Sequence, residues 1–215
     1  MSRVYVYVVA RDFGFAPNPF HGYCTLATCK PRIRSTAHVD DWVVGMGGSR
    51  LRARGRCVFA MRVTETLTFN EYWSNPIYFD KRPVRNGSRK MMVGDNIYHY
   101  DSAPPEWHQE DSHHSNVDGS INPDNLRTDT QADKVLISRY FFYFGTAAPI
   151  IPEYILTSIG FKNRIGHRVF DFSECVALIE WLHTNFAGSL NTIQADPFDF
   201  DKSDKRYSAR NNKIF

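Results

Sequence analysis

The sequence predicts an α+β fold: one domain with a curved, barrel-like mixed sheet and a few flanking helices. Strands are indicated by runs rich in β-branched and aromatic residues, at 4–9, 41–45, 57–63 and 135–145. Helical spacing of apolar residues indicates a helix that begins at Asp171 or Ser173 and ends at Phe186. No internal repeat or clean linker divides the 215 residues, so strands and helices are expected to share one core.

The elements follow from their local residues. The first strand, 4–9, is continuously β-branched and aromatic, which is typical of a buried strand. Met46 to Gly48, with two glycines, predict a turn after the second strand. Thr68 and Glu71 have capping-box spacing and predict a short helix over 68–73.

The second half of the chain alternates between irregular and regular segments. Residues 101–133 carry several prolines and many Asp, Asn and Ser residues, which predicts a long irregular loop. The run 135–145 is the most β-prone of the chain and is expected to form a central strand. We predict that the domain spans 1–194 and that 195–215 form a C-terminal tail.

Composition and motif content limit the class of protein. No uninterrupted run of about 18 apolar residues is present, which argues against a membrane span, and residues 1–11 lack the order of a signal peptide. We therefore expect a cytoplasmic protein that does not bind membranes. The four cysteines, which lack metal-ligand spacing, are expected to be reduced packing residues: Cys24, Cys29, Cys57 and Cys175.

The charge is distributed unevenly around a net value of +3. Residues 1–94 carry 15 Lys and Arg against 6 Asp and Glu, whereas residues 95–133 carry 1 against 9. A basic half of this kind suits a protein that neutralises phosphates. The pattern favours a polyanion as the partner. The acidic stretch would weaken this attraction, so we expect it to face elsewhere or to have a site of its own.

Residues 12–23 form an unusual proline-rich loop after the first strand. Its aromatic residues can stack on an extruded base, while an Asn side chain can pair with a base edge and a carboxylate can stabilise a sugar cation. The alternative is a hydrophobic turn whose polar groups satisfy the backbone. The candidate site residues are Asp12, Phe13, Phe15, Asn18, Phe20, His21 and Tyr23.

Two further groups of residues are candidates for binding or chemistry. Alternate arginines after Ser49 would project from one face of an extended segment, and nearby glycines would let the backbone approach a phosphate. A solvated edge strand is the alternative. The residues expected to contact the DNA backbone are Lys30, Arg32, Arg34, Arg50, Arg52, Arg54, Arg89 and Lys90.

The acidic stretch contains four of the eight histidines but no zinc-binding spacing, so no metal site is predicted. His99 with Asp95 or Asp101 forms a possible acid/base pair, and a structural hydrogen-bond network is the alternative. The other histidines of this stretch are His108, His113 and His114.

Five stretches resemble, in order, the second nucleotide-modification-associated domain family over residues 4–150: FGFAPNPFHGYCTLATCKPRIR, VDDWVVGMGG, FAMRVTETLTFNEYW, GDNIYHY and ISRYFFYFG. The resemblance implies action on DNA with modified bases, in phage genomes or in bacterial defence loci. FAPNPFHG is also similar to the loops of uracil-type DNA glycosylases. The family's motifs fall on Asp12, Asn18, His21, Asp41, Trp42, Asp95, Asn96 and His99.

We therefore predict a DNA glycosylase that excises a bulky modified pyrimidine, such as glucosylated hydroxymethylcytosine, from double-stranded phage DNA and needs no cofactor. Asp12 would act on water or the sugar, Asn18 would hold the base, and Trp42 would help to bind it. His99 with Asp95 is the reserve acid/base pair. The alternatives are a non-catalytic reader with a PUA-like or EVE-like barrel and a metal-dependent nuclease that uses the acidic stretch.

Overall fold

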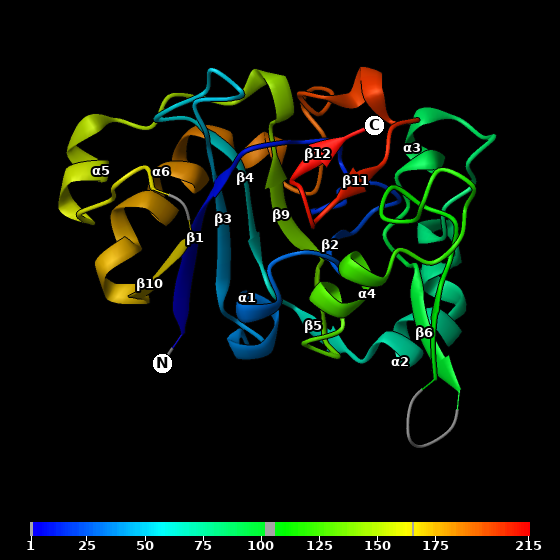
Figure 1. Cartoon of the computed structure of the whole chain (residues 1–215). Coiled ribbons are helices and arrows are strands. Elements are labelled where there is room, and N and C mark those ends of the chain that lie inside the picture. The colour runs from blue at the N-terminus through cyan, green and yellow to red at the C-terminus, as the bar shows by residue number, and fades with distance from the viewer. Residues whose placement is uncertain (1, 102–105, 165) are drawn as a thin grey trace. The chain divides into compact units, whose positions relative to one another are not determined.

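The computed structural model describes residues 2–101, 106–164 and 166–215 (Figure 1). These residues divide into two compact units, each assembled from three separate stretches of chain. Unit 1 contains Met1–Asp12, Ala37–Glu65 and Ser138–Phe198. Unit 2 contains Phe13–Thr36, Thr66–Ile137 and Asp199–Phe215.

Unit 1 is built on a five-stranded mixed sheet with the order β10-β1-β3-β4-β9. β1 and β3 are parallel and the other neighbours are antiparallel. A parallel pair needs a long crossover, and the first stretch of unit 2 lies within it. The strands are β1 (Arg3–Val9), β3 (Trp42–Gly47), β4 (Cys57–Arg62), β9 (Tyr140–Tyr143) and β10 (His167–Asp171).

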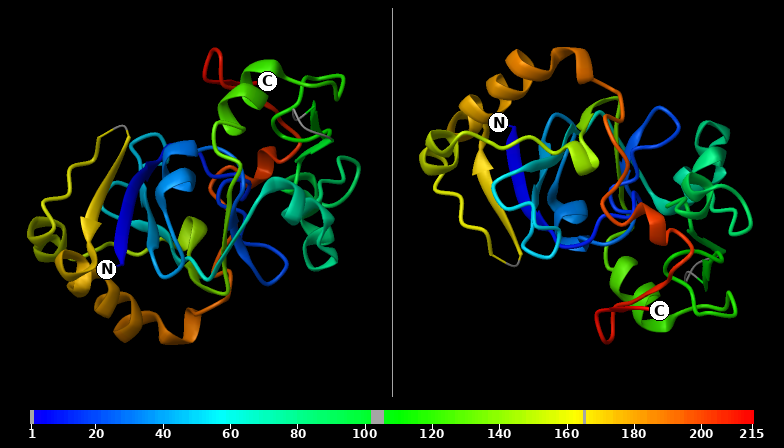
Figure 2. Two further views of the ribbon diagram at one scale, coloured as in Figure 1. Left: turned by 90° about the horizontal axis from the view of Figure 1, so that it is seen from below. Right: turned by 90° about the horizontal axis from the view of Figure 1, so that it is seen from above.

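Helices of unit 1 pack beside this sheet, and Figure 2 shows α6 (Val176–Phe186) along one side of it. Leu178, Ile179 and Leu182 of α6 are buried, as expected for the apolar face of an amphipathic helix. Asp171 and Glu174 form a capping box just before it, so the expected start of this helical segment is confirmed. The remaining helices of this unit are α5 (Glu153–Ser158) and the 3₁₀ turns η2 (Gly145–Ala147), η3 (Phe172–Cys175) and η4 (Ala187–Ser189).

Unit 2 has smaller sheets and short helices around an aromatic core. Its strands are β2 (Cys24–Leu26), β8 (Val135–Ser138) and β5 (Glu65–Leu67) in one sheet, and the pairs β6 (Tyr98–Asp101) with β7 (Glu106–Gln109) and β11 (Tyr207–Ser208) with β12 (Lys213–Ile214). Its helices are α1 (Pro31–Thr36), α2 (Phe69–Ser74), α3 (Arg89–Met92), α4 (Pro123–Asp129), η1 (Pro76–Lys81) and η5 (Phe200–Lys202).

The structure confirms an α+β fold with a mixed sheet, and among the described residues no sheet closes into a barrel. Three local expectations were wrong. The strand after Asp41 continues through Gly47, so Met46 to Gly48 do not form the expected turn. The run 135–145 was expected to be one strand, but it forms two strands, β8 and β9, which belong to different sheets and are separated by Arg139.

The third difference concerns the predicted loop 101–133, whose residues 102–105 lie outside the described residues. The rest contains β7 and α4, which begins at Pro123 with the side chain of Asn122 as its cap. The predicted tail is ordered in unit 2 from Asp199 onward, where the backbone N–H of Tyr207 donates to the carbonyl of His113. No helix in the described part of the chain has the length and apolar character to cross a membrane.

Replacing Thr68 with alanine is expected to lower the free energy of unfolding by about 1 kcal/mol. The Thr68 side chain accepts a hydrogen bond from the backbone N–H of Glu71, and the Glu71 carboxylate accepts from the backbone N–H of Thr68. The bonds that the Glu71 carboxylate accepts from the backbone N–H and the hydroxyl of Thr68 lower the pKa of Glu71. Urea denaturation of Thr68→Ala tests this, with Thr128→Ala on α4 as a non-capping control; equal losses would contradict it.

Candidate functional site

The two predicted site residues of unit 1 are built into its core. The Asp12 carboxylate accepts a hydrogen bond from the Tyr143 hydroxyl at 2.6 Å and another from the backbone N–H of Phe198. The indole of Trp42 is 3% exposed and packs edge-on against Tyr140 and His183. Asp12 and Trp42 therefore contribute to the packing of unit 1, and their expected roles at a base-binding site stay predictions.

Asn18 and Asp95 belong to a buried polar cluster in unit 2. The Asn18 amide donates to the carbonyl of Val93 at 2.8 Å and accepts from the ammonium of Lys81 at 2.7 Å. Asp95 accepts from the hydroxyls of Thr25 and Tyr72, and burial raises its pKa against the opposing charge of Lys81. The amide nitrogen and the amide oxygen of Asn18 are thus both engaged in buried hydrogen bonds, and its expected role in holding a base edge stays a prediction.

The aromatic residues of the proline-rich loop form part of the core of unit 2. Phe13 and Phe15 pack against the ring of His113, and Phe20 stacks on Phe200. His21 is partly buried, which together with nearby lysines lowers its pKa. The expected aromatic slot is therefore filled by the protein's own side chains, including that of Tyr23 against Tyr78.

The prediction that Arg34 contacts a DNA phosphate is wrong, because this side chain is fully buried. Its guanidinium has a structural role, because it donates to four backbone carbonyls, those of Cys29, Ala132, Lys134 and Asp129. The expected extended rail after Ser49 is also wrong, since the chain makes successive turns there. Gly45 and Gly47 serve packing, because an added Cβ would collide with Phe59 and Ala53.

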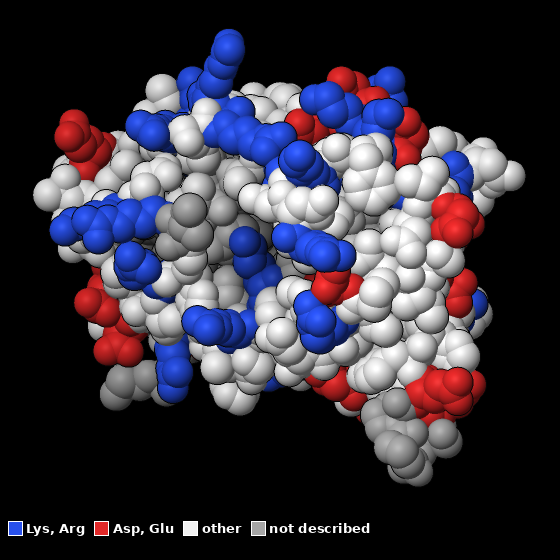
Figure 3. All heavy atoms as spheres, in the orientation of Figure 1, with Lys and Arg blue, Asp and Glu red and all other residues white. Residues whose placement is uncertain are grey.

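The other predicted phosphate-binding residues are accessible. Figure 3 shows that basic side chains predominate on the face of unit 1 presented there. Arg50, Arg52 and Arg54 are exposed in unit 1. In unit 2, Lys30 is half-buried, whereas Arg32, Arg89 and Lys90 are exposed. Contact of these residues with DNA stays a prediction.

His99 lies at a different site, where it pairs with Glu110 rather than Asp95. Its Nε2 atom is 2.9 Å from Oε1 of Glu110, which follows the last residue of β7. The β6-β7 register places His99 opposite His108, and Glu110 follows two residues after His108. The His99 imidazole stacks on two other rings. Its centroid lies 4.4 Å from the centroid of the Trp73 ring and 4.8 Å from that of the His108 ring.

Glu110 also lines an open cleft in unit 2 with a volume of about 570 Å³. This volume lies within the range of about 300–1,000 Å³ that is usual for small-molecule sites. The lining combines an aromatic ring, two guanidinium groups and two carboxylates. The lining residues are Trp73, Arg82, Pro83, Arg85, Asn86, Glu110 and Asp111.

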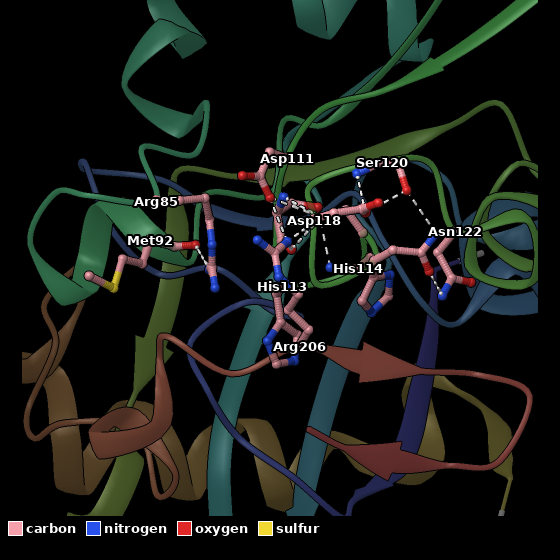
Figure 4. Close-up of polar contacts among 12 residues, drawn as sticks. Arg85, Met92, Asp111, His113, His114, Asp118, Ser120, Asn122 and Arg206 are labelled. Carbon is pink, nitrogen blue, oxygen red and sulfur yellow. Dashed lines mark hydrogen bonds and ion pairs between the residues drawn. The ribbon is translucent and has the colours of Figure 1, made fainter.

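The C-terminal segment fixes Asp111. Arg206 reaches the Asp111 carboxylate at 2.5 Å and also donates to Ser112 and Ser115 (Figure 4). Partial burial opposes ionisation of Asp111, but the hydrogen bonds from Arg206 and Ser115 outweigh it and lower the pKa of this carboxyl. Asp111 is therefore a fixed negative charge beside the Glu110–His99 pair.

The two arginines of the cleft are held by the backbone. Arg82 donates to the carbonyl of Trp73 at 2.6 Å, and its guanidinium lies 3.7 Å from the centre of the Trp73 ring. Arg85 donates to the carbonyls of Met92, Ser203 and Asp204. Rigid, positively charged groups of this kind suit the recognition of an anionic or oxygen-rich ligand.

Replacing Arg206 with glutamine is expected to raise the pKa of Asp111 toward its ordinary value. The guanidinium supplies both a hydrogen bond and a positive charge to this carboxylate, and glutamine removes the charge. An NMR titration of the Asp111 carboxyl in the variant and in the parent protein measures the shift. Lys205→Gln is the control, because Lys205 pairs with Asp204 instead; an unchanged Asp111 pKa in Arg206→Gln would contradict the prediction.

The residues of this cleft show what sequence reasoning missed. The acidic stretch was identified, but Glu110 and Asp111 were not selected from it. Glu110 reaches His99 because β6 pairs with β7, and Arg206 approaches Asp111 from 95 residues away. The alternation of His99, Asp101, His108 and Glu110 across a turn was a signal for the hairpin, whereas nothing local indicated Arg206.

Comparison with family models places the chain in a family. The model described as nucleotide modification associated domain 2 matches residues 1–204, which is nearly the whole chain. No curated protein and no solved structure matches the chain. The protein therefore belongs to the nucleotide modification associated domain 2 family, which links it to modified nucleotides.

Proposed function

We propose that the protein is a hydrolase that excises a bulky modified pyrimidine, such as glucosylated hydroxymethylcytosine, from double-stranded DNA, with chemistry at the cleft of unit 2. One observation carries this proposal: two neighbouring carboxylates, Glu110 and Asp111, have different partners in one cleft. Unequal environments of paired carboxylates are how glycoside-cleaving enzymes separate the acid from the ionised group.

The partners suggest a role for each carboxylate. Asp111, held ionised by Arg206, would stabilise the positive charge that develops on the sugar as the bond to the base breaks. Glu110 with His99 would move the proton, donating it to the departing base or accepting it from the attacking water. Water supplies the hydroxyl group left on the sugar, so no further reactant is needed.

The other residues of the cleft suit a nucleotide. Arg82 and Arg85 offer fixed positive charge for a phosphate, and the exposed Asn86 can both donate to and accept from a base or sugar hydroxyl. A volume of about 570 Å³ has room for a base that carries a bulky substituent. An extruded base would enter from the open side of this cleft.

Incubation with modified and unmodified duplex DNA tests the proposal. We expect release of free modified base, detected by mass spectrometry, together with alkali-labile sites and no release from unmodified DNA. Binding of modified DNA without any released base would overturn the proposal and favour the non-catalytic reader. Strand breaks that need no alkali and stop with a chelator would favour the nuclease instead.

The biological setting that we propose is bacterial defence against phages with modified DNA. Excision of a modified base damages only DNA that carries it, so the same chemistry spares an unmodified host genome. Plating of a phage with glucosylated cytosines on cells that express the protein, compared with a phage that lacks the modification, tests this setting. Equal plating of both phages would contradict it.

A further inference from the structure

A cysteine, a histidine and an aspartate that are far apart in the sequence converge in unit 2, outside the cleft. Cys29 lies between β2 and α1, His114 lies between β7 and α4, and Asp129 is the last residue of α4. The Nδ1 atom of His114 is 2.7 Å from the Asp129 carboxylate, and its Nε2 atom is 3.8 Å from the sulfur of Cys29. His114 and Asp129 are buried, whereas Cys29 is partly exposed.

Hydrogen bonds hold the three side chains in a row, with His114 between Asp129 and Cys29. The Asp129 carboxylate accepts from the Tyr98 hydroxyl and from the backbone N–H of Cys29 as well as from His114. Burial opposes ionisation, but the charges of His114 and Arg34 lower the pKa of Asp129. An ionised Asp129 places a proton on Nδ1 of His114, so that the opposite nitrogen of the ring faces the thiol.

The surroundings of the imidazole favour its charged form. Burial acts against the charge, but Asp129 and Cys29 raise the pKa of His114 to about 10. His113 and Tyr207 are the other titratable rings against it, and Phe15 covers it from the proline-rich loop. An imidazolium beside a sulfur stabilises the thiolate, which is the nucleophilic form of cysteine.

The backbone presents Cys29 in a strained turn. Cys29 and Lys30 have φ angles of 57° and 43°, in the left-handed region that non-glycine residues rarely adopt. Asp129 holds the N–H of Cys29, and the buried guanidinium of Arg34 holds its carbonyl at 2.8 Å. Strain that is retained in this way between a strand and a helix is a feature of nucleophile sites.

The same geometry argues against a metal ion held by all three residues. Asp129 and Cys29 face opposite nitrogens of one imidazole ring. The oxygens of Asp129 are already occupied by three donors, from Cys29, His114 and Tyr98. The arrangement is that of a carboxylate that orients an imidazole and an imidazole that activates a thiol.

We propose that Cys29 is a nucleophile activated by His114, that Asp129 is a positioning residue, and that the centre takes a pyrimidine base as its electrophile. Pyrimidines have an electron-poor C5=C6 double bond, and the family connects the chain with nucleotides. The sulfur forms a bond to C6 while the π electrons of the double bond move to C5. A proton from Nε2 of His114 passes to C5, and the reverse sequence releases both groups unchanged.

The first test measures the reactivity of the thiol in the full-length protein. We expect iodoacetamide to label Cys29, quantified by peptide mass spectrometry, at a rate that changes little between pH 6 and pH 8. His114→Gln should restore the increase of about tenfold per pH unit that an ordinary thiol shows in this range. His113→Gln is the matched control and should retain the flat profile.

The parent protein alone decides this test if His114→Gln does not fold. A Cys29 rate in the parent that rises about tenfold per pH unit, as for a free cysteine, would overturn the activated thiol. The buried Cys24, Cys57 and Cys175 serve as slow internal references.

The second test addresses the substrate class. A DNA oligonucleotide that carries one 2-pyrimidinone base should form a covalent adduct with the parent protein, visible as added mass, and none with Cys29→Ser. Iodoacetamide labelling with a flat pH profile but without this adduct would overturn the pyrimidine assignment. Cys29→Ser should still release base at the cleft, so failure of either proposal is distinguishable from failure of the other.

Discussion

Replacing Asp111 with asparagine is expected to slow the release of modified base by about 10²- to 10³-fold, because a fixed charge that faces a developing cation contributes this much to catalysis. Asparagine keeps the size of the side chain and one hydrogen-bond acceptor for Arg206. It removes only the negative charge. The loss should therefore appear in the rate of the chemical step and not in the affinity for modified DNA, as measured by single-turnover kinetics and by binding.

Asp118→Asn is the matched control for this variant. Asp118 lies in the same segment, and its hydrogen bonds from Ser120 likewise lower its pKa, but it is not a lining residue of the cleft. It should retain the parent rate. Equal rates for Asp111→Asn and the parent protein would remove Asp111 from the mechanism and leave Glu110 with His99 as the remaining pair.

The pH dependence of base release has a defined sign. A carboxyl whose pKa is lowered stays ionised until the pH falls below its ordinary range, so the contribution of Asp111 is lost only on the acid side. Arg206→Gln should move this acid limb of the rate profile to higher pH. A limb that stays in place would show that another group controls it.

Local patterns predicted β1, β3, β4, α2 and α6, but not the shorter elements such as β2, α1 and β11. Residues 4–9 are buried on both faces of a sheet, so they read as an unbroken apolar run, and Thr68 with Glu71 satisfies the start of a helix within four residues. The division into two units was not predictable in this way. Each unit combines stretches far apart in the sequence, and no local signal marks where the chain passes from one sheet to another.

The candidate sites were harder to predict for the same reason. His99 was identified as an acid/base residue, but its partner lies across a hairpin that was expected to be a loop. Cys29 was expected to be a packing residue, since His114 lies 85 positions away and Asp129 lies 100 positions away. Asn18 is expected from its polar side chain in an aromatic loop, and Asp95 as the acid/base partner of His99, but both lie in one buried polar network.

The centre of that network is the ammonium group of Lys81, which is 1% exposed. It donates to the backbone carbonyl of Asn18, to the Asn18 side chain and to the backbone carbonyl of Tyr23, at 2.7 to 2.9 Å. Its positive charge also favours ionisation of the buried Asp95. Lys81 therefore ties the proline-rich loop to η1, in addition to the ring contact between Tyr23 and Tyr78.

Replacing Lys81 with methionine is expected to lower the free energy of unfolding by about 3–5 kcal/mol, because three acceptors lose their donor and Asp95 loses its counter-charge. Urea denaturation measures the loss, and the exposed Lys90→Met is the control. Burial lowers the pKa of Lys81 to about 8 from 10.5 in the unfolded chain. Between these pH values the unfolded chain binds the additional proton, so the parent gains stability relative to Lys81→Met as the pH rises. A pH-independent difference between the two proteins would show that Lys81 acts through packing alone.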